Sequence, residues 1–442
     1  MNISLLRHIV LLGCLFVSAL MQIHGASLTF SGISRTALSE TPNSSSGLDA
    51  IYVLPTVSNA SASYKASTQN VKWLKWGMQG AAYATEIPAS NIIKSGNSYT
   101  LTNIEGNCGY TIEDGSSIHY FWIVDYSTHP YSVSAVHVDD DSDCAMTSLR
   151  TEGTADRIFY YSINARAYEI DRDIHISYLT LKSDSESFTF NQVTTDESVA
   201  YINGSIHVPS PLCDTYFKVS GDKFMSAWGV PMECISGYYN TSSVEAIVNV
   251  MQEERENDNE QSADMDDTAL GGSAPCDISM KAVVSDAAIF HEWQITSDPS
   301  FNDVLLRATE LDYTHTFSEM GSYYIRFMCA DASGKCEWYS DTYTVFIGES
   351  RLLCPNAFSP NASPGVNDEW KVSYRSLISF ECYIFNKWGV KVAEFKDPAQ
   401  GWDGKYNGKF VPAGVYYYVI KAEGADGVKY DLSGDINIVN YK

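Results

Sequence analysis

The sequence predicts an all-β fold built from a row of β-sandwiches. Stretches such as YFWIVDYS, SYYIRFMCA and GVYYYVIKA alternate aromatic and β-branched residues, and Gly, Asn, Asp or Pro separates them at short intervals. The 29 tyrosines suit half-buried strand faces, with the ring inward and the hydroxyl at the edge. Convincing amphipathic helices are missing. A chain of 442 residues should hold about three or four such domains.

Residues 1–26 are expected to be a signal peptide. Arg7 stands in a short polar start, and the apolar run 9–21 is about 13 residues long, too short to span a bilayer comfortably. An alternative is a lipoprotein box, LLGC, that would acylate Cys14, but apolar residues continue beyond that cysteine. No later segment approaches a transmembrane length, so we expect an exported chain without a transmembrane anchor.

Two β-sandwich domains are expected first, over residues 27–140 and 141–250, with the acidic stretch DDDSDC between them. In the first domain, VKWLKWG sets Trp73 and Trp76 three residues apart, which in a strand places them on opposite faces. Either both are covered, or one belongs to the core and the other is a binding platform for carbohydrate or protein.

An acidic linker, residues 251–275, is expected to follow, because it holds eight acidic residues, one Arg and almost nothing apolar. Such a stretch cannot bury enough surface to offset its ordering entropy, so it should be disordered or extended. Residues 276–350 then resemble an immunoglobulin or PKD-type module. FHEWQIT places Trp293 on a central strand, and CADASGKC forms a tight hairpin.

Nine cysteines remain once Cys14 is set aside, and in an exported chain they are expected to form disulfides. A zinc site is disfavoured because no CxxC or CxH cluster exists. Nine is odd, so one thiol, Cys329 or Cys336, should be left over. The expected pairs are Cys108 with Cys144, Cys213 with Cys234, Cys276 with Cys336 or Cys329, and Cys354 with Cys382.

The last domain, residues 351–442, differs in charge from the rest. It carries 11 basic and 10 acidic residues, whereas the preceding residues carry 18 and 44. The acidic body disfavours nucleic acid and anionic membranes as partners. Within the tail, the blocks NAFSPNASPGVNDEWKV, ISFECYIFNKWGVKVAEF, GWDGKYNGKFVPAGVYYYVIKA and SGDINIV follow in a fixed order.

These blocks resemble the gliding-motility-associated C-terminal domain of Bacteroidota, the type B sorting domain of the type IX secretion system. The complete expectation is therefore tandem immunoglobulin-like β-sandwich domains ending in a small β-sandwich sorting domain. Trp388 should close one end of its core, and both faces of the strand around Tyr416 should be covered. The matching residues are Asn356, Phe358, Ser359, Pro360, Asn361, Asn367, Asp368, Phe385, Asn386, Trp388, Gly389, Trp402, Asp403, Gly404, Gly408, Pro412, Gly414, Tyr416, Gly434 and Asp435.

The opening block departs from the family's usual pattern, because Ala362, Ser363, Pro364 and Gly365 stand where an acidic GDG segment is expected. Calcium prefers several carboxylate or carbonyl oxygens on one loop, and one such ligand is lost here. We therefore expect no cation, and a loop shaped by Pro360 and Pro364.

The resemblance implies transport to the periplasm and then through the type IX translocon, with outer-membrane shuttle components as partners. The cell surface or the extracellular space is the expected destination, and the front domains would serve adhesion to a host or cell-surface ligand, other binding or surface structure. One alternative is an accessory or signalling component of the secretion machinery. A weaker one is a secreted hydrolase using a carboxylate pair.

Other candidate sites are weaker. Asp139, Asp141 and Asp143 have the first spacings of an EF-hand loop, but Cys144 and Arg150 stand where Gly and Glu are needed. No nucleophile or zinc-protease motif is present, and the histidines are scattered, so neither an enzyme nor a cofactor is expected. Within the acidic linker, the short pattern DTA makes Thr268 an O-glycosylation candidate.

Overall fold

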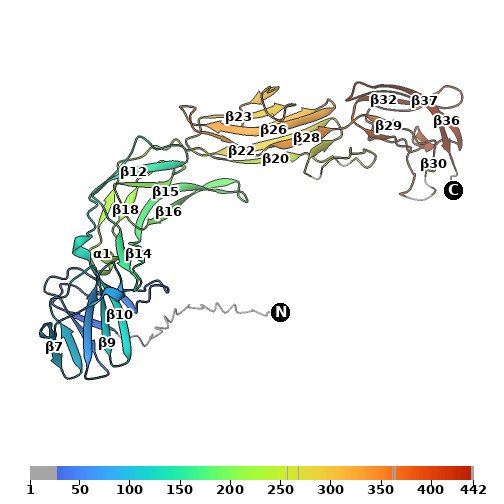
Figure 1. Ribbon diagram of the computed structural model, residues 1–442. Coiled ribbons are helices and arrows are strands. Elements are labelled where there is room, and N and C mark those ends of the chain that lie inside the picture. The colour runs from blue at the N-terminus through green and yellow to red at the C-terminus, as the bar shows by residue number, and fades with distance from the viewer. Residues whose placement is uncertain (1–26, 256, 267, 361, 363–364, 440–442) are drawn as a thin grey trace, which may run out of the picture.

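The computed structural model describes residues 27–439 except 256, 267, 361, 363 and 364, so the expected signal peptide lies outside the described residues. The all-β prediction is confirmed: four β-sandwiches follow one another in a bent row (Figure 1), and the described residues hold a single short α-helix, α1 (Lys223–Ala227). In the described part of the chain, no helix is both long and apolar enough to cross a membrane.

The first sandwich packs a four-stranded sheet, β1-β4-β8-β7, on a six-stranded sheet, β2-β3-β10-β9-β5-β6. Trp73 and Phe121 fill the core between the sheets, and Trp76 is buried on the opposite face of the six-stranded sheet. The suggestion that one of the two tryptophans is an exposed platform is therefore wrong. The strands are β1 (Leu28–Ser31), β2 (Leu38–Glu40), β3 (Ala50–Leu54), β4 (Ser61–Lys65), β5 (Val71–Trp76), β6 (Thr85–Glu86), β7 (Ile92–Ser95), β8 (Ser98–Leu101), β9 (Cys108–Asp114) and β10 (Ser117–Asp125).

The second sandwich combines the sheets β11-β12-β17, β13-β14 and β16-β15-β18-β19. The acidic stretch 139–143 joins β11 to β12, which pair with each other. It is therefore a turn inside this sandwich rather than the boundary before it. The strands are β11 (Ala135–Val138), β12 (Met146–Glu152), β13 (Ile158–Tyr161), β14 (Ala167–Ile170), β15 (Ile174–Asp184), β16 (Thr189–Val199), β17 (Ser205–Pro209), β18 (Lys218–Ser220) and β19 (Glu233–Ile235).

The apolar core of the second sandwich continues onto the outer face of the first, separate from the first sandwich's own core. The rings of Trp76 and Trp122 lie 5.4 Å apart on the outer face of the six-stranded sheet and contact the core of the second sandwich. Beside them, Asp222 Oδ2 accepts hydrogen bonds from Arg172 Nη2 at 2.6 Å and from the Tyr126 hydroxyl at 2.9 Å. Both charged side chains are fully buried, so this joint is a continuation of the core and not a flexible linker.

The third sandwich begins earlier than expected, because β20 pairs with β22 along its whole length. Its sheets are β20-β22-β25 and β21-β28-β26-β23-β24, with β27 beside β26. The predicted Trp293 is fully buried against Phe327. The strands are β20 (Ala246–Gln252), β21 (Leu270–Gly272), β22 (Cys276–Val284), β23 (Phe290–Thr296), β24 (Leu306–Ala308), β25 (Asp312–Phe317), β26 (Gly321–Ala330), β27 (Glu337–Tyr339) and β28 (Tyr343–Ile347).

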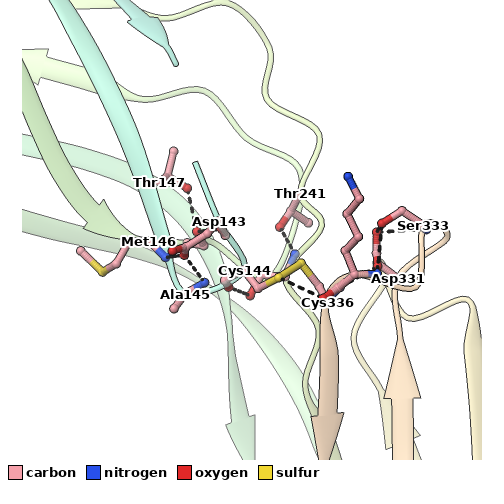
Figure 2. The surroundings of a disulfide bond; sticks show 12 residues. Asp143, Cys144, Ala145, Met146, Thr147, Thr241, Asp331, Ser333 and Cys336 are labelled. Atoms are coloured by element: carbon pink, nitrogen blue, oxygen red, sulfur yellow. Dashed lines mark hydrogen bonds between the residues drawn. A yellow bond between two sulfur atoms is a disulfide. The ribbon is translucent and has the colours of Figure 1, made fainter. Parts of the chain in front are cut away.

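A disulfide between Cys144 and Cys336 joins the second sandwich to the third (Figure 2). Both cysteines lie in turns that face each other across the joint, whereas the expected pairs with Cys108 and Cys276 would need cysteines that are buried elsewhere. The predicted pairs of Cys108 with Cys144 and of Cys276 with Cys336 are therefore wrong. The predicted pairs of Cys213 with Cys234 and of Cys354 with Cys382 are not formed either. The free cysteines are Cys108, Cys213, Cys234, Cys276, Cys329, Cys354 and Cys382.

The fourth sandwich is built on the five-stranded sheet β30-β37-β36-β32-β33, covered by the pairs β29-β31 and β34-β35. Trp370, Cys382 and Ile420 are at the centre of its core. The strands are β29 (Arg351–Leu353), β30 (Ala357–Phe358), β31 (Ser373–Arg375), β32 (Leu377–Phe385), β33 (Lys391–Phe395), β34 (Lys405–Tyr406), β35 (Lys409–Phe410), β36 (Gly414–Gly424) and β37 (Lys429–Ile438).

The acidic segment between β20 and β21 is not a free linker in the described residues. It leaves the third sandwich, contacts the fourth and returns as β21, which pairs in parallel with β28. The prediction of disorder from its lack of apolar residues is therefore wrong. Backbone hydrogen bonds and polar side-chain contacts hold this segment in place instead. We call residues 257–263 the strap.

The joint between the first two sandwiches should be sensitive to loss of its buried cation. Replacing Arg172 by Met leaves the buried Asp222 carboxylate without its partner, which typically costs about 3–5 kcal/mol. Urea unfolding of the mature chain, followed by tryptophan fluorescence, should show this loss in the transition of the first two sandwiches. Arg150→Met is the matched control, because its ion pair with Asp139 is exposed and worth about 0–1 kcal/mol. Equal shifts for the two variants would contradict the assignment.

Candidate functional site in the C-terminal sandwich

The first and third sequence blocks of the tail meet in space. Strand β30 runs parallel to the end of β37, which sets the Phe358 ring 5.5 Å from the Trp402 ring. Gly404 has φ +76°, and a Cβ there would lie 2.9 Å from Pro360 Cγ. Only glycine fits this approach without a shift, so the residues of the two blocks depend on each other.

Trp402 then connects these blocks to β36. Its ring lies 5.2 Å from that of Tyr416, and the Tyr416 hydroxyl donates to the Pro412 carbonyl at 3.0 Å. The backbones of Trp402 and Trp370 exchange both hydrogen bonds, at 2.9 and 3.0 Å. The motif aromatics are thus mostly buried and hold the shape of the domain.

Two turns of the tail have a backbone conformation that favours glycine. Gly389 ends the turn after β32 with φ +78°, and Asn386 Oδ1 accepts the N–H groups of Trp388 and Val390, each at 3.0 Å. Gly408 has φ +76° in the turn between β34 and β35. Glycine adopts this conformation without a steric penalty.

Three further motif residues, Gly434 and Asp435 of β37 and Asp403 before β34, have local structural roles. A Cβ on Gly434 would lie 2.6 Å from the Tyr418 hydroxyl, so the ring of Tyr418 needs a glycine opposite it. Asp435 accepts a hydrogen bond from the Asn437 amide at 2.9 Å, and Asp403 accepts one from the Lys405 N–H at 3.0 Å. Both carboxylates therefore accept hydrogen bonds from groups two residues away in the chain.

Trp388 does not close the core as predicted, because 76% of it is exposed. The buried Trp370 and Trp402 fill the core instead. The outer face of β36 is also less covered than expected, since Val415 is 41% exposed and Tyr417 46% exposed. The domain therefore presents apolar side chains to solvent.

The exposed Trp388 borders a groove of about 280 Å³, which we call the aromatic groove. Lys387 is the one charged residue among those that line it, and its Nζ lies 4.6 Å from the Trp388 ring centre. No periodic sequence pattern marks this groove, because residues of two turns and of β33, β34 and β36 come together to form it. Its lining is Asn386, Lys387, Trp388, Val392, Tyr406, Val411, Pro412, Ala413, Gly414, Val415 and Tyr416.

The loop that opens the tail uses its polar groups internally. The Ser359 N–H donates to the Asn367 carbonyl at 3.0 Å, and the Gly365 N–H donates to Asp368 Oδ2 at 2.6 Å. Asn361 and Pro364 lie outside the described residues, so the expected role of the second proline stays a prediction. Over the described residues, no group of three or more His, Cys, Asp or Glu could hold a metal ion.

Two other candidates have ordinary surroundings. In the acidic turn, Asp143 Oδ1 accepts the N–H groups of Ala145 and Met146, which lowers the pKa of this carboxyl. Thr268 is exposed in the turn before β21, while Asp267 of the same pattern lies outside the described residues. Glycosylation at Thr268 stays a prediction.

Replacing a buried and an exposed tryptophan of this sandwich by alanine should have different effects on the free energy of unfolding. Trp370→Ala opens a cavity in the core and should cost about 3–5 kcal/mol of unfolding free energy. Trp388→Ala removes an exposed ring and should change stability by about 0.5 kcal/mol or less. Thermal unfolding of the mature chain measures both, and a large loss for Trp388→Ala would show that its ring is part of the core.

Comparison with known proteins agrees with the sequence motifs. Residues 135–236 match a fibronectin type III domain, and residues 352–438 match the CHU_C type IX secretion signal domain. No curated protein matches the chain.

Solved structures that align with the chain are distant from it. A tetra-tandem repeat from the extending region of a large adhesion protein is 13% identical, with a TM-score of 0.21, over 94% of this chain and 100% of that one. The FN1–FN3 domains of chicken CNTN1 are 11% identical, with a TM-score of 0.23, over 69% and 98%. Dimeric latent PorU from Porphyromonas gingivalis is 9% identical, with a TM-score of 0.15, over 73% and 35%. With TM-scores this low, the alignments carry no conclusion. The chain thus contains the type IX secretion signal domain that its tail motifs predicted, together with a fibronectin type III domain in its second sandwich.

Proposed function

We propose that the chain is a cargo protein of type IX secretion, which its C-terminal sandwich directs across the outer membrane to the cell surface or the medium. The observation that carries this proposal is the match of residues 352–438 to the secretion signal domain. The convergence of Phe358, Trp402 and Tyr416 in one core supports it, because separate sequence blocks then build a single folded unit.

The partners in this proposal are the translocon and its outer-membrane shuttle components. The buried motif residues preserve the shape of the domain, so a partner that reads the folded domain must contact other atoms. The aromatic groove offers such atoms, because Trp388 and Tyr406 are exposed while Asn386 holds the turn in place. Tryptophan and tyrosine are enriched among the residues that dominate binding at protein interfaces.

The front sandwiches serve adhesion, other binding or surface structure in this proposal. Their joints are tied, so they extend as one body from the sorting domain. Their acidic residues promote solubility and disfavour nucleic acid. The described residues contain no cluster that would suggest metal-dependent catalysis, and we propose a non-enzymatic role.

Export of a reporter protein tests whether the C-terminal sandwich is the sorting signal. A fluorescent protein is placed behind a signal peptide and in front of residues 351–442 or residues 244–442, and is expressed in a bacterium with a type IX system. We expect the longer fusion to reach the surface or the medium, because it keeps the strap and the third sandwich. If both fusions stay periplasmic, the proposal is refuted. A second experiment treats whole cells that express the intact protein with added protease: surface cargo should be digested, whereas a periplasmic signalling component should be protected.

The same fusion tests the groove. Trp388→Ala should lower export about tenfold or more, since loss of a central interface aromatic commonly costs about 2 kcal/mol or more. Ile378→Ala is the matched control, because Ile378 is also an exposed apolar residue, 46% exposed, but lies at the opposite end of β32. Equal export of the two variants would show that the groove is not needed for sorting, and would leave the proposal that the C-terminal sandwich is the sorting signal unchanged.

A further inference from the structure

Only three residues join the third sandwich to the sorting sandwich, and each is held by contacts from outside the joint. Gly348 is buried against the strap, where a Cβ on it would lie 2.5 Å from Ala263 Cβ. The Glu349 carbonyl accepts a hydrogen bond from Arg375 Nε at 2.8 Å. Ser350 donates from its N–H and its hydroxyl to the Asp426 carboxylate, at 2.9 and 2.7 Å.

The strap pairs with the sorting sandwich through its backbone. The Tyr374 N–H donates to the Asn259 carbonyl at 3.1 Å, and the Gln261 N–H donates to the Tyr374 carbonyl at 2.7 Å. The Asn259 side-chain amide donates to the carbonyls of Val372 and Pro398, both at 2.8 Å. The strap thus adds a short parallel strand beside β31, which already pairs with β29 on its other side.

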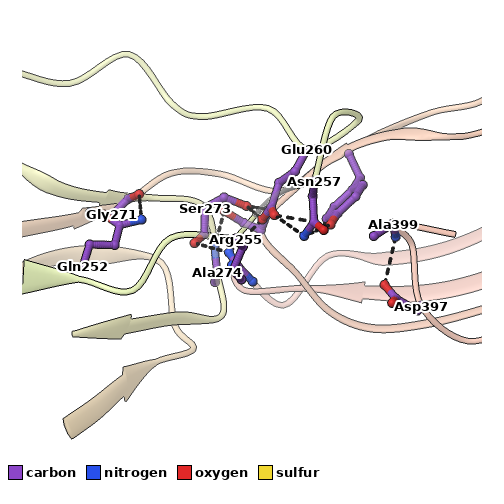
Figure 3. Close-up of polar contacts among 11 residues, drawn as sticks. Gln252, Arg255, Asn257, Glu260, Gly271, Ser273, Ala274, Asp397 and Ala399 are labelled. Atoms are coloured by element: carbon purple, nitrogen blue, oxygen red, sulfur yellow. Dashed lines mark hydrogen bonds and ion pairs between the residues drawn. The ribbon is translucent and has the colours of Figure 1, made fainter. Parts of the chain in front are cut away.

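A polar cluster fixes the strap to the third sandwich (Figure 3). The Glu260 carboxylate, 10% exposed, accepts hydrogen bonds from Arg255 Nη2 at 2.8 Å, from the Ser273 hydroxyl at 2.6 Å and from the Asn257 amide at 3.0 Å. Ser273 Oγ also accepts the N–H of the fully buried Ser376 at 2.8 Å. Charge-assisted hydrogen bonds of this kind are about twice as strong as neutral ones.

A signal that is removed after transport needs a junction that a protease can reach, and proteolysis favours exposed backbone with few hydrogen bonds. Here the junction is short, each of its three residues is held by a contact, and the strap covers Gly348. We propose that the sorting sandwich is not released from the transported protein, because the strap clamps its junction. This inference rests on the proposed function only for its cellular setting, since the clamp itself is a property of the folded chain.

Proteolysis of the purified mature chain tests the clamp without any secretion system. A glutamate-specific endopeptidase can cut after Glu349 or after Glu186, and both residues are exposed. Glu186 lies in the turn between β15 and β16, whereas Glu349 lies in the clamped junction. We expect cleavage after Glu349 to be at least tenfold slower than cleavage after Glu186, measured by the masses of the fragments over time. Similar rates would overturn the proposal.

Variants of the strap add a second comparison. The double variant Asn259→Ala, Glu260→Ala removes side-chain contacts on both sides of the strap and should speed cleavage after Glu349 about tenfold. Glu254→Ala is the matched control, because Glu254 is an exposed acidic residue just before the strap. If the double variant does not fold, the comparison of the two glutamates in the wild-type chain still decides the question.

The same property is measured on exported protein. In all of the protein recovered from the surface or the medium, peptides from residues 351–442 should be as abundant as peptides from the third sandwich. A product that ends between residues 347 and 352 would overturn the proposal. Failure of the chain to leave the periplasm would refute the proposed function instead, and the cleavage rates in the purified chain would still decide whether the clamp exists.

Discussion

The N–H of Gln261 donates to the carbonyl of Tyr374, and this pairing makes a segment of the third sandwich an edge strand of the fourth. The position of the sorting domain depends on that contact and on the cluster around Glu260, because the three-residue junction alone would leave it hinged. The other joints are tied by different means. At the first joint, an apolar core continues from the second sandwich onto the first, and the Tyr126 hydroxyl donates to Asp222 of a buried ion pair in the second sandwich. The second joint uses a disulfide.

Because of these contacts, the sorting domain is not a separate module at the end of the chain. A sorting domain on a flexible linker can be recognised and removed as a separate module, whereas this one shares backbone hydrogen bonds with the sandwich before it. Its aromatic groove lies between the turns after β32 and before β36, where the exposed rings of Trp388 and Tyr406 stand beside the core residues Val411 and Tyr416. The sorting sandwich and the three sandwiches before it are therefore parts of one structure, and the aromatic groove remains exposed to a partner.

Much of the tail could be predicted from the sequence because its signals are local. Gly389, Gly404 and Gly408 mark turns by a backbone conformation that glycine favours. Along β36 both alternating faces are apolar enough to predict that both are covered, yet only the side of Tyr416 and Ile420 is buried. Trp388 was misjudged because it stands in a turn, where alternation ends and no pattern tells an exposed ring from a buried one. All-β architecture followed from the same short-range patterns.

The joints could not be predicted because their partners are far apart in sequence. Cys144 and Cys336 are 192 residues apart, and spacing within domains favoured other pairs. The strap was expected to be disordered because composition measures the apolar area that a segment can bury, and it does not register backbone pairing with a distant edge. The short run of β20 was assigned to the second sandwich for the same reason, since pairing with β22 was not visible in the sequence.

Small-angle X-ray scattering of the oxidised mature chain tests most directly whether the four sandwiches form one tied body. The account predicts a profile that a single bent arrangement like that of Figure 1 fits. Replacing Cys144 and Cys336 by Ser should broaden the distribution of conformations at the second joint alone. A profile of the oxidised wild-type chain that requires four independently moving sandwiches would contradict the account.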